Sequence, residues 1–375
     1  MKKNILAFFC IMLVCSLIAC NSTASGIPSD STESPKGDIG GALCSVMALR
    51  CEINNAAGEL FAMSDGTAII YRIVDDDAYL LTNFHVVHNS FSTSDSSMIC
   101  QTIEARPYGA GETDGIAAEC LWYSLEYDLA VLRVDSLLNF FPSAKEVRTD
   151  NGHVCSPLDE IIAVGNSNGA GIAVHSGHIA RVRELVTIPV SYQPSDLTLS
   201  LIRYDAAVDN GDSGGALFSP SGALIGLINA KRKDNNGGFA IPTASFAPIV
   251  DDVVGDCIAK VPPEAYALRF GVKASEKYIK TEYDTERELP YAVYELTLGE
   301  PEVGSVSSLF LKKDDVLIAV TINEDTEISL DTLDALSSVL LECRAGDTLT
   351  WKYRRAGKDE TYTLTVSQAQ MEKIK

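Results

Sequence analysis

Short apolar runs, four to eight residues long, recur through the middle of the chain and are separated by residues that favour turns. Seven of these runs are predicted as strands, at positions 67–74, 79–82, 129–134, 161–164, 179–182, 197–202 and 224–228. The Asp-rich segment 75–77 and the Ser-Pro-Ser-Gly segment 219–222 predict turns between neighbouring strands. Many short strands with few helices predict a mainly β domain, either a barrel or a sandwich.

A different pattern begins near residue 261. Its strands are predicted at 291–298, 316–322, 348–354 and 360–366. Between the second and third of them, positions 330–342 carry one apolar stripe of Leu and Val at helical spacing, with Ser329 as the predicted N-cap. Strands, one helix and a final hairpin in this order predict a small α+β domain.

The N-terminus has the composition of a bacterial targeting signal. Two lysines precede an apolar run at 5–18 that is shorter than a typical membrane span. The run ends in Leu-Ile-Ala-Cys, which resembles a lipobox, so we predict removal of residues 1–19 and diacylation of Cys20. A plain secretory signal with an unrelated cysteine is the alternative. Residues 20–41, rich in Ser, Thr, Pro and Gly, are predicted to form a flexible tether between the lipid and the folded part.

The charge balance restricts the possible partners. The 375 residues carry 30 Lys and Arg against 51 Asp and Glu, which gives a net charge of −21. No basic surface able to neutralise phosphates is expected, so nucleic acid is excluded as a partner. With 46% hydrophobic and 22% charged residues, the composition is that of a globular protein with an acidic, solvated surface.

Ten cysteines are present, and seven of them follow Cys20. These seven are Cys44, Cys51, Cys100, Cys120, Cys155, Cys257 and Cys343. An odd number leaves at least one thiol free in a monomer. Cys44–Cys51 and Cys100–Cys120 are the pairs nearest in sequence, but the connectivity stays open, and buried free thiols are an equal alternative. No C-x-x-C segment occurs, and neither a metal site nor a cofactor is predicted.

The most informative segment contains Gly-Asp-Ser-Gly-Gly, in which Ser213 is flanked by residues that allow a tight turn. On such a turn the amides of Gly211 and Ser213, with Asp212 between them, are expected to form an oxyanion hole. Two upstream residues complete a catalytic set. His85 ends an apolar run within Leu-Thr-Asn-Phe-His-Val-Val, and Asp128 begins another within Asp-Leu-Ala-Val-Leu. Each residue alone also has a structural interpretation, as a strand-end histidine, a turn aspartate or a turn serine.

These segments, in the order His85, Asp128, Ser213, resemble the trypsin-fold serine proteases of the HtrA/Deg family, which are bacterial quality-control proteases that carry PDZ domains. Further counterparts are Ala-Val-Gly-Asn at 163–166, Val-His-Ser-Gly at 174–177 and Gly-Phe-Ala-Ile-Pro at 238–242. The resemblance is strong over residues 42–250 and weak in the C-terminal part. It implies two six-stranded barrels over 42–255 with the site between them, followed by a PDZ-like domain of the circularly permuted bacterial type over 261–370.

The resemblance also implies roles for the catalytic set. His85 would act as the base, Asp128 would orient it, and Ser213 would attack the substrate carbonyl. His88 lies three residues further on but lacks the sequence setting of His85. The chain departs from the family at 209–210, where Asn-Pro is usual, and at Ser167, where proline is usual. A loop without proline has more competing conformations, so the resting enzyme is expected to be only partly competent.

Two binding sites are implied as well. The primary specificity pocket would have Ala207 at its base and a wall formed by Leu227, Ile228 and Asn229. An apolar, limited pocket favours small or medium aliphatic side chains before the scissile bond. In the PDZ-like domain, a carboxylate-binding loop would consist of Arg269, Phe270, Gly271 and Val272 and would accept the C-terminus of a peptide that adds a strand. A domain used only for packing is the alternative.

We therefore expect a serine endopeptidase, anchored by the Cys20 lipid to the outer face of a bacterial cell membrane, that cleaves misfolded or damaged proteins through an acyl-enzyme. Its expected partners are unfolded polypeptides, C-terminal peptides at the PDZ-like domain and, since the family often forms trimers, further copies of the chain. Two alternatives stay open: a peptide-sensing chaperone or scaffold whose triad is rarely engaged, and a signalling protease with one dedicated substrate.

Overall fold

The computed structural model describes residues 39–55, 57–91, 98–111, 113–149, 155–232 and 237–374. Cys20, the predicted signal and most of the predicted tether lie outside these residues. The described part is dominated by β-strands and confirms the mainly β class that the apolar runs predict. No helix within it is both long and apolar enough to cross a membrane.

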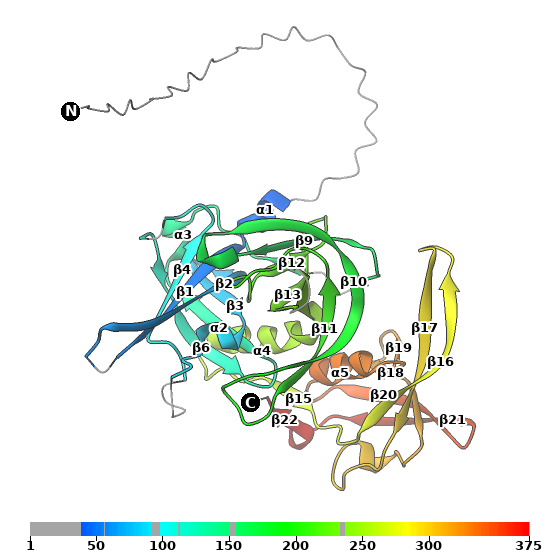
Figure 1. Cartoon of the computed structure of the whole chain (residues 1–375). Helices are drawn as coiled ribbons and strands as arrows, with labels where there is room; N and C mark the ends of the chain where they lie inside the picture. Colours follow the sequence, from blue (N-terminus) through cyan, green and yellow to red (C-terminus); the bar gives the residue numbers. More distant parts are fainter. Residues whose placement is uncertain are drawn as a thin grey trace, which may run out of the picture. The chain divides into compact units, whose positions relative to one another are not determined.

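The first sheet contains seven antiparallel strands in the order β5-β4-β1-β2-β3-β7-β6. Figure 1 shows this part of the chain in blue to cyan. Their bounds are Val46–Asn54 (β1), Leu60–Val74 (β2), Asp77–Thr82 (β3), Thr102–Pro107 (β4), Ile116–Ala117 (β5), Glu119–Ser124 (β6) and Leu129–Val134 (β7). Short helices α1 (Ile39–Leu43), α2 (Phe84–Val87) and α3 (Leu137–Phe140) accompany them. Apolar side chains such as Met47, Leu49, Ile70, Leu80 and Leu132 are fully buried and form the core of this sheet.

The second sheet also has seven strands, in the order β12-β9-β10-β11-β14-β13-β8, and an additional β12–β13 pairing closes it. Their bounds are Arg148–Thr149 (β8), Glu160–Gly165 (β9), Ala173–Ile188 (β10), Leu197–Tyr204 (β11), Ala216–Phe218 (β12), Ala223–Lys231 (β13) and Gly238–Pro242 (β14). We predicted six strands for each barrel. The difference lies in β5 and β8, two-residue strands whose sequences are too short to carry an alternating apolar pattern.

The C-terminal part is the predicted small α+β unit. Its main sheet has the order β16-β17-β18-β20-β21, with β19 paired to β18, and β15 pairs separately with β22. The bounds are Tyr266–Leu268 (β15), Ala274–Asp284 (β16), Leu289–Leu298 (β17), Val316–Ile322 (β18), Ile328–Ser329 (β19), Leu333–Glu342 (α5), Thr348–Arg355 (β20), Lys358–Thr365 (β21) and Met371–Lys373 (β22). The Trp351 ring is fully buried and stacks on Phe270, with 4.7 Å between the ring centroids.

The start of helix α5 differs from the prediction. Thr332, not Ser329, is its N-cap, because the Thr332 side chain accepts from the Ala335 amide at 3.2 Å. Ser329 is instead part of β19, where it lies opposite Ala319 of β18. A short strand therefore occupies the residues in which a helix start was expected.

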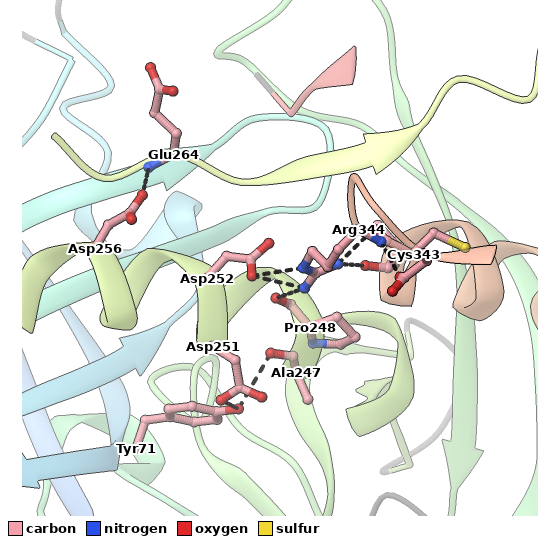
Figure 2. Close-up of polar contacts among 11 residues, drawn as sticks. Tyr71, Ala247, Pro248, Asp251, Asp252, Asp256, Glu264, Cys343 and Arg344 are labelled. Atoms are coloured by element: carbon pink, nitrogen blue, oxygen red, sulfur yellow. Dashed lines mark hydrogen bonds and ion pairs between the residues drawn. The ribbon is translucent and has the colours of Figure 1, made fainter. Parts of the chain in front are cut away.

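Helix α4 (Ala247–Ala259) makes polar contacts with both parts of the chain, as Figure 2 shows. The Tyr71 hydroxyl of β2 donates to Asp251 at 2.9 Å, and Arg344, just after α5, donates through Nε to Asp252 at 3.1 Å. Apolar side chains of α4 share one buried cluster with Ile374 near the C-terminus. The helix is thus a structural element of both the β domain and the C-terminal unit.

Candidate active site

His85 and Asp128 are brought together by two neighbouring strands of the first sheet. His85 lies in the short helix α2, directly after β3, and Asp128 directly precedes β7. β3 and β7 pair antiparallel with Thr82 opposite Ala130, so both residues lie at the same end of this pair. Asp128 adopts a φ of 52°, and its backbone carbonyl accepts from the Phe84 amide at 3.2 Å.

The Asp128 carboxylate holds His85 through two hydrogen bonds. The imidazole Nδ1 lies 2.7 Å from Oδ2, and the His85 backbone amide donates to Oδ1 at 2.9 Å. Asp128 is 2% exposed, whereas 36% of the His85 side chain is exposed. Because Nδ1 donates to the carboxylate, Nε2 is left as the acceptor. Burial disfavours the imidazolium, but the charge and hydrogen bond of Asp128 outweigh it and raise the pKa of His85.

Ser213 lies on the expected tight turn before β12. The Thr67 amide donates to its carbonyl at 2.9 Å. A Cβ on Gly214, which has a φ of 82°, would lie 2.0 Å from the Thr67 carbonyl oxygen, so the turn requires glycine there. The Ser213 hydroxyl donates to the Asn229 carbonyl at 3.1 Å, and among the described residues no hydrogen bond joins it to His85. Proton transfer to His85 therefore requires the hydroxyl to turn away from Asn229.

The amides of Gly211 and Ser213 are available to an oxyanion. The Asn168 amide donates to the Asn210 carbonyl at 2.6 Å. Across a trans peptide the N–H and C=O groups point in opposite directions, so the Gly211 N–H points away from Asn168. Within the described part of the chain, neither the Gly211 nor the Ser213 amide donates to a protein acceptor. Two unpaired donors on adjacent turns are what stabilisation of a tetrahedral intermediate requires.

Asp212 stabilises the loop, and its amide is not available to the oxyanion. Its amide donates to the Asp209 carbonyl at 3.3 Å. Its carboxylate, only 2% exposed, accepts from the Ser167 hydroxyl at 2.8 Å and from the Asp209 amide at 2.7 Å. Burial raises the pKa of Asp212 in spite of these two hydrogen bonds. Ser167, at a position where the family usually has proline, thus supplies a partner for this buried carboxylate.

The predicted carboxylate-binding loop consists of Arg269, Phe270, Gly271 and Val272 and lies just before β16, an edge strand of its sheet. The Arg269 amide already donates to the Gln370 carbonyl at 2.8 Å. Among the described residues the next three amides have no protein acceptor. Gly271 has a φ of 67°, and a Cβ there would lie 2.2 Å from the Ser305 Cβ, so only glycine fits. Free amides beside an open strand edge suit a peptide C-terminus.

Comparisons with known proteins agree with this arrangement. A family model described as a trypsin-like peptidase domain matches residues 66–227, the range that contains His85, Asp128 and Ser213. The "Serine protease Do-like HtrA" of Lactococcus lactis subsp. lactis (strain IL1403) is 27% identical over 323 residues, which cover 82% of this chain and 71% of the relative. The chain is a serine endopeptidase with a trypsin-like fold, and its sequence is similar to those of HtrA-type proteases.

Two further comparisons concern shorter or more distant matches. The "Probable periplasmic serine endoprotease DegP-like" of Rhizobium meliloti (strain 1021) is 31% identical over 194 residues, 49% of this chain and 32% of that protein. The solved structure "HtrA-type protease AlgW with tripeptide" covers 88% of this chain and 96% of its own, with a TM-score of 0.56 and 21% identity. At this identity the likeness confirms the fold, a trypsin-like β domain followed by a PDZ-like unit.

Asn229, which we predicted in the wall of the specificity pocket, also contacts the catalytic set. Its side chain, 3% exposed, donates through Nδ2 to the Asp128 Oδ2 at 2.7 Å, while its backbone carbonyl accepts from Ser213. Asn229 therefore contacts two members of the catalytic set. The only signal in the sequence is a single amide residue within the apolar strand β13.

Thr67 is a second residue that sequence reasoning missed. Its hydroxyl donates to the Gly211 carbonyl at 2.7 Å and accepts from the Asn166 amide at 2.8 Å. Thr67 belongs to the first sheet and is fully buried, whereas its two partners lie in loops between strands of the second sheet. One side chain thus ties the oxyanion loop to the neighbouring barrel.

The other predicted pocket residues lie apart from the cavity beside His85. A cavity of about 530 Å³ lies beside His85, and Met63, Tyr192 and Asn229 contribute to its wall. Leu227 and Ile228 are 0% and 1% exposed and belong to two different core clusters, while Ala207 is half-buried. None of these last three lines the cavity, so their part in specificity stays a prediction. No cluster of three or more metal-ligating side chains occurs among the described residues.

Proposed function

We propose that this protease is a membrane-anchored, extracytoplasmic serine endopeptidase that cleaves misfolded or damaged proteins. The observation that carries the proposal is the His85–Asp128 pair together with the unpaired amides of Gly211 and Ser213. These are the base, its orienting group and the oxyanion donors that acyl transfer needs. A loosely selective enzyme of this kind suits unfolded chains, whose apolar segments are exposed.

The mechanism follows from the positions of these groups. The Ser213 hydroxyl turns from the Asn229 carbonyl to His85 Nε2 and gives up its proton as its oxygen attacks the substrate carbonyl. The Gly211 and Ser213 amides donate to the oxyanion that results. Asp128 stabilises the imidazolium without taking the proton, and His85 then protonates the leaving amine. Water, activated by the same imidazole, hydrolyses the acyl-enzyme in the second half of the reaction.

We also propose that the PDZ-like unit binds peptide C-termini. The amides of Phe270, Gly271 and Val272 and the free edge of β16 support this role. The domain limits 42–255 and 261–370, the specificity pocket at Ala207 and assembly into a homotrimer belong to the same proposal. Among solved structures, those entitled "HtrA-type protease AlgW" with tripeptide and with decapeptide show that protein with bound peptides.

Localisation rests on the N-terminal sequence and on relatives named as periplasmic. Two acyl chains on Cys20 would anchor the protein stably, whereas one chain gives only marginal binding. Cys20→Ala is expected to move the protein from the membrane fraction to a soluble or unprocessed pool. Unchanged labelling of Cys20→Ala with a fatty-acid probe would exclude this anchor.

Unfolded casein is the substrate for the decisive experiment. Wild type is compared with Ser213→Ala and with Ser221→Ala, which removes an exposed serine from the turn between β12 and β13. Loss of the nucleophile lowers turnover by about 10⁶, so only Ser213→Ala should lose activity. Equal casein turnover by wild type and Ser213→Ala would refute the protease assignment. A Ser213→Ala protein that still prevents casein aggregation would add a chaperone role.

A further inference from the structure

Two buried thiols meet in the first sheet. Cys51 lies in β1 and is 0% exposed, and Cys100 lies just before β4 and is 6% exposed. β1 and β4 pair antiparallel with Cys51 opposite Ile103, which brings these two distant segments of the sequence side by side. The two thiols hydrogen-bond to each other and belong to one apolar cluster.

The pair is connected to the segment that carries the catalytic histidine. The Cys100 amide donates at 2.9 Å to the carbonyl of Val87, the last residue of helix α2. In addition, Ile99 and His88 form an isolated antiparallel bridge. Cys100 thus joins the segment after His85 to strand β1, and a covalent bond between the two thiols would fasten this connection.

We propose that Cys51 and Cys100 form an oxidisable dithiol, which a disulfide-containing oxidant converts into an intramolecular disulfide. In the first step the Cys100 thiolate attacks one sulfur of the oxidant, forms a mixed disulfide and releases the first thiolate of the oxidant. In the second step Cys51, which loses its proton to the medium, attacks the Cys100 sulfur and releases the second thiolate. The protein loses two electrons and two protons, and the oxidant becomes two thiols.

The order of the two steps follows from the environments of the sulfurs. The hydrogen bond from Cys51 favours a thiolate at Cys100 and lowers the pKa of Cys100. The same hydrogen bond, together with complete burial, raises the pKa of Cys51. Cys100 is also the more exposed of the two, so it is the attacking thiol and Cys51 resolves the mixed disulfide.

Other described thiols are less suited to the reaction. Cys120 packs against the same cluster, but its thiol donates to the Trp122 carbonyl at 3.6 Å, and burial raises its pKa to about 12. Cys44 donates to the Gly40 carbonyl at 3.6 Å. Neither pair that is nearest in sequence, Cys44–Cys51 or Cys100–Cys120, is bonded in the structure, where all seven described cysteines are free.

Peptide mapping of the full chain tests the proposal. Purified protein is incubated with oxidised glutathione or with dithiothreitol, quenched with acid, digested with chymotrypsin and analysed without reduction. We expect one linked peptide pair containing Cys51 and Cys100 in the oxidised sample, and free thiols in the reduced one. The thermal midpoint of the oxidised protein should rise by roughly 5–15 °C. Oxidised protein in which both thiols still react with iodoacetamide after unfolding, or in which they join other cysteines, overturns the proposal.

Cysteine variants distinguish the attacking thiol, Cys100, from the resolving thiol, Cys51. In Cys51→Ala the reaction should stop at the first step, with glutathione bound to Cys100, whereas Cys100→Ala should gain no glutathione at Cys51. Cys120→Ala, at a residue that packs against the same cluster, is the matched control and should still form the Cys51–Cys100 bond. A glutathione adduct on Cys51 in Cys100→Ala would contradict the assigned order. The wild-type peptide map decides the proposal even if a variant fails to fold, and it does not depend on protease activity.

Discussion

Replacing Asn229 with alanine tests how far the catalytic pair depends on a third side chain. The substitution removes the Nδ2 hydrogen bond to Asp128 Oδ2, at 2.7 Å, but leaves the backbone carbonyl that accepts from Ser213. A hydrogen bond to a buried charged group is worth about 1.5–3 kcal/mol. If this energy supports the transition state, kcat/KM falls by roughly 10- to 150-fold, since about 1.36 kcal/mol corresponds to a factor of ten. The loss should appear mainly in kcat, because the lost bond is to Asp128.

The pH profile gives the sharper measurement. The Asn229 amide partly neutralises the Asp128 carboxylate, so its loss strengthens the attraction between Asp128 and the imidazolium. The acid limb of kcat/KM should therefore move to higher pH in Asn229→Ala. Casein hydrolysis from pH 5 to 9, together with titration of Ser213 by a fluorophosphonate probe, separates a change in rate from a loss of folded enzyme.

Asn83→Ala is the matched control. Asn83 is also fully buried and donates through Nδ2 to Asp128, at 3.0 Å, but to the backbone carbonyl instead of the carboxylate. This variant should lose stability without a shift of the acid limb. Wild-type kcat/KM and an unmoved acid limb in folded Asn229→Ala would refute the reasoning, and so would equal shifts in the two variants.

Three other outcomes are expected. Since the pKa of His85 is raised above 6.5 and only the neutral imidazole acts as base, the acid limb of wild-type kcat/KM should lie above pH 6.5, and a limb at or below that value would contradict the Asp128 interaction. Because the pKa of Asp212 is raised above 3.8 in the folded state, the stability that its protonated form contributes is lost as pH rises through the folded pKa. In Asp212→Asn the Ser167 hydroxyl can accept instead of donate, so urea unfolding should show a variant more stable than wild type at pH 7, with a smaller difference at pH 4; a less stable variant at pH 7 would argue against this sign. A peptide with an apolar C-terminus should raise the turnover of a short peptide substrate by roughly 5- to 150-fold, whereas its C-terminally amidated form should not, and a change confined to the apparent KM would mean that the PDZ-like unit only concentrates substrate.

The local settings of the three proposed catalytic residues could be predicted from the sequence, because each residue lies in a short segment whose own pattern defines a strand end or a glycine turn. Ser213 needs Gly214 for its turn, and His85 and Asp128 follow and precede apolar strands, so local sequence carries most of the information. The class of fold could be predicted for the same reason, since short apolar runs and turns are local features.

Contacts that depend on the packing of distant strands could not be predicted. Asn229 is the only amide side chain in the apolar strand β13. The residues next to it in the sequence do not indicate that this strand places it against Asp128. The Cys51–Cys100 contact depends on the pairing of β1 with β4, whereas distance along the chain favoured other pairs. The buried Asp212 carboxylate is similar, because its partner Ser167 comes from a separate loop.

The position of Ile374 affects when the buried core can be completed during synthesis. Its side chain is 5% exposed, its amide donates to the Ala265 carbonyl at 2.9 Å, and it belongs to the same buried cluster as α4 and strands of both barrels. Because a chain is synthesised from its N-terminus, this cluster stays incomplete until residue 374 has been added. A chain that stops before Ile374 therefore lacks part of the protease core.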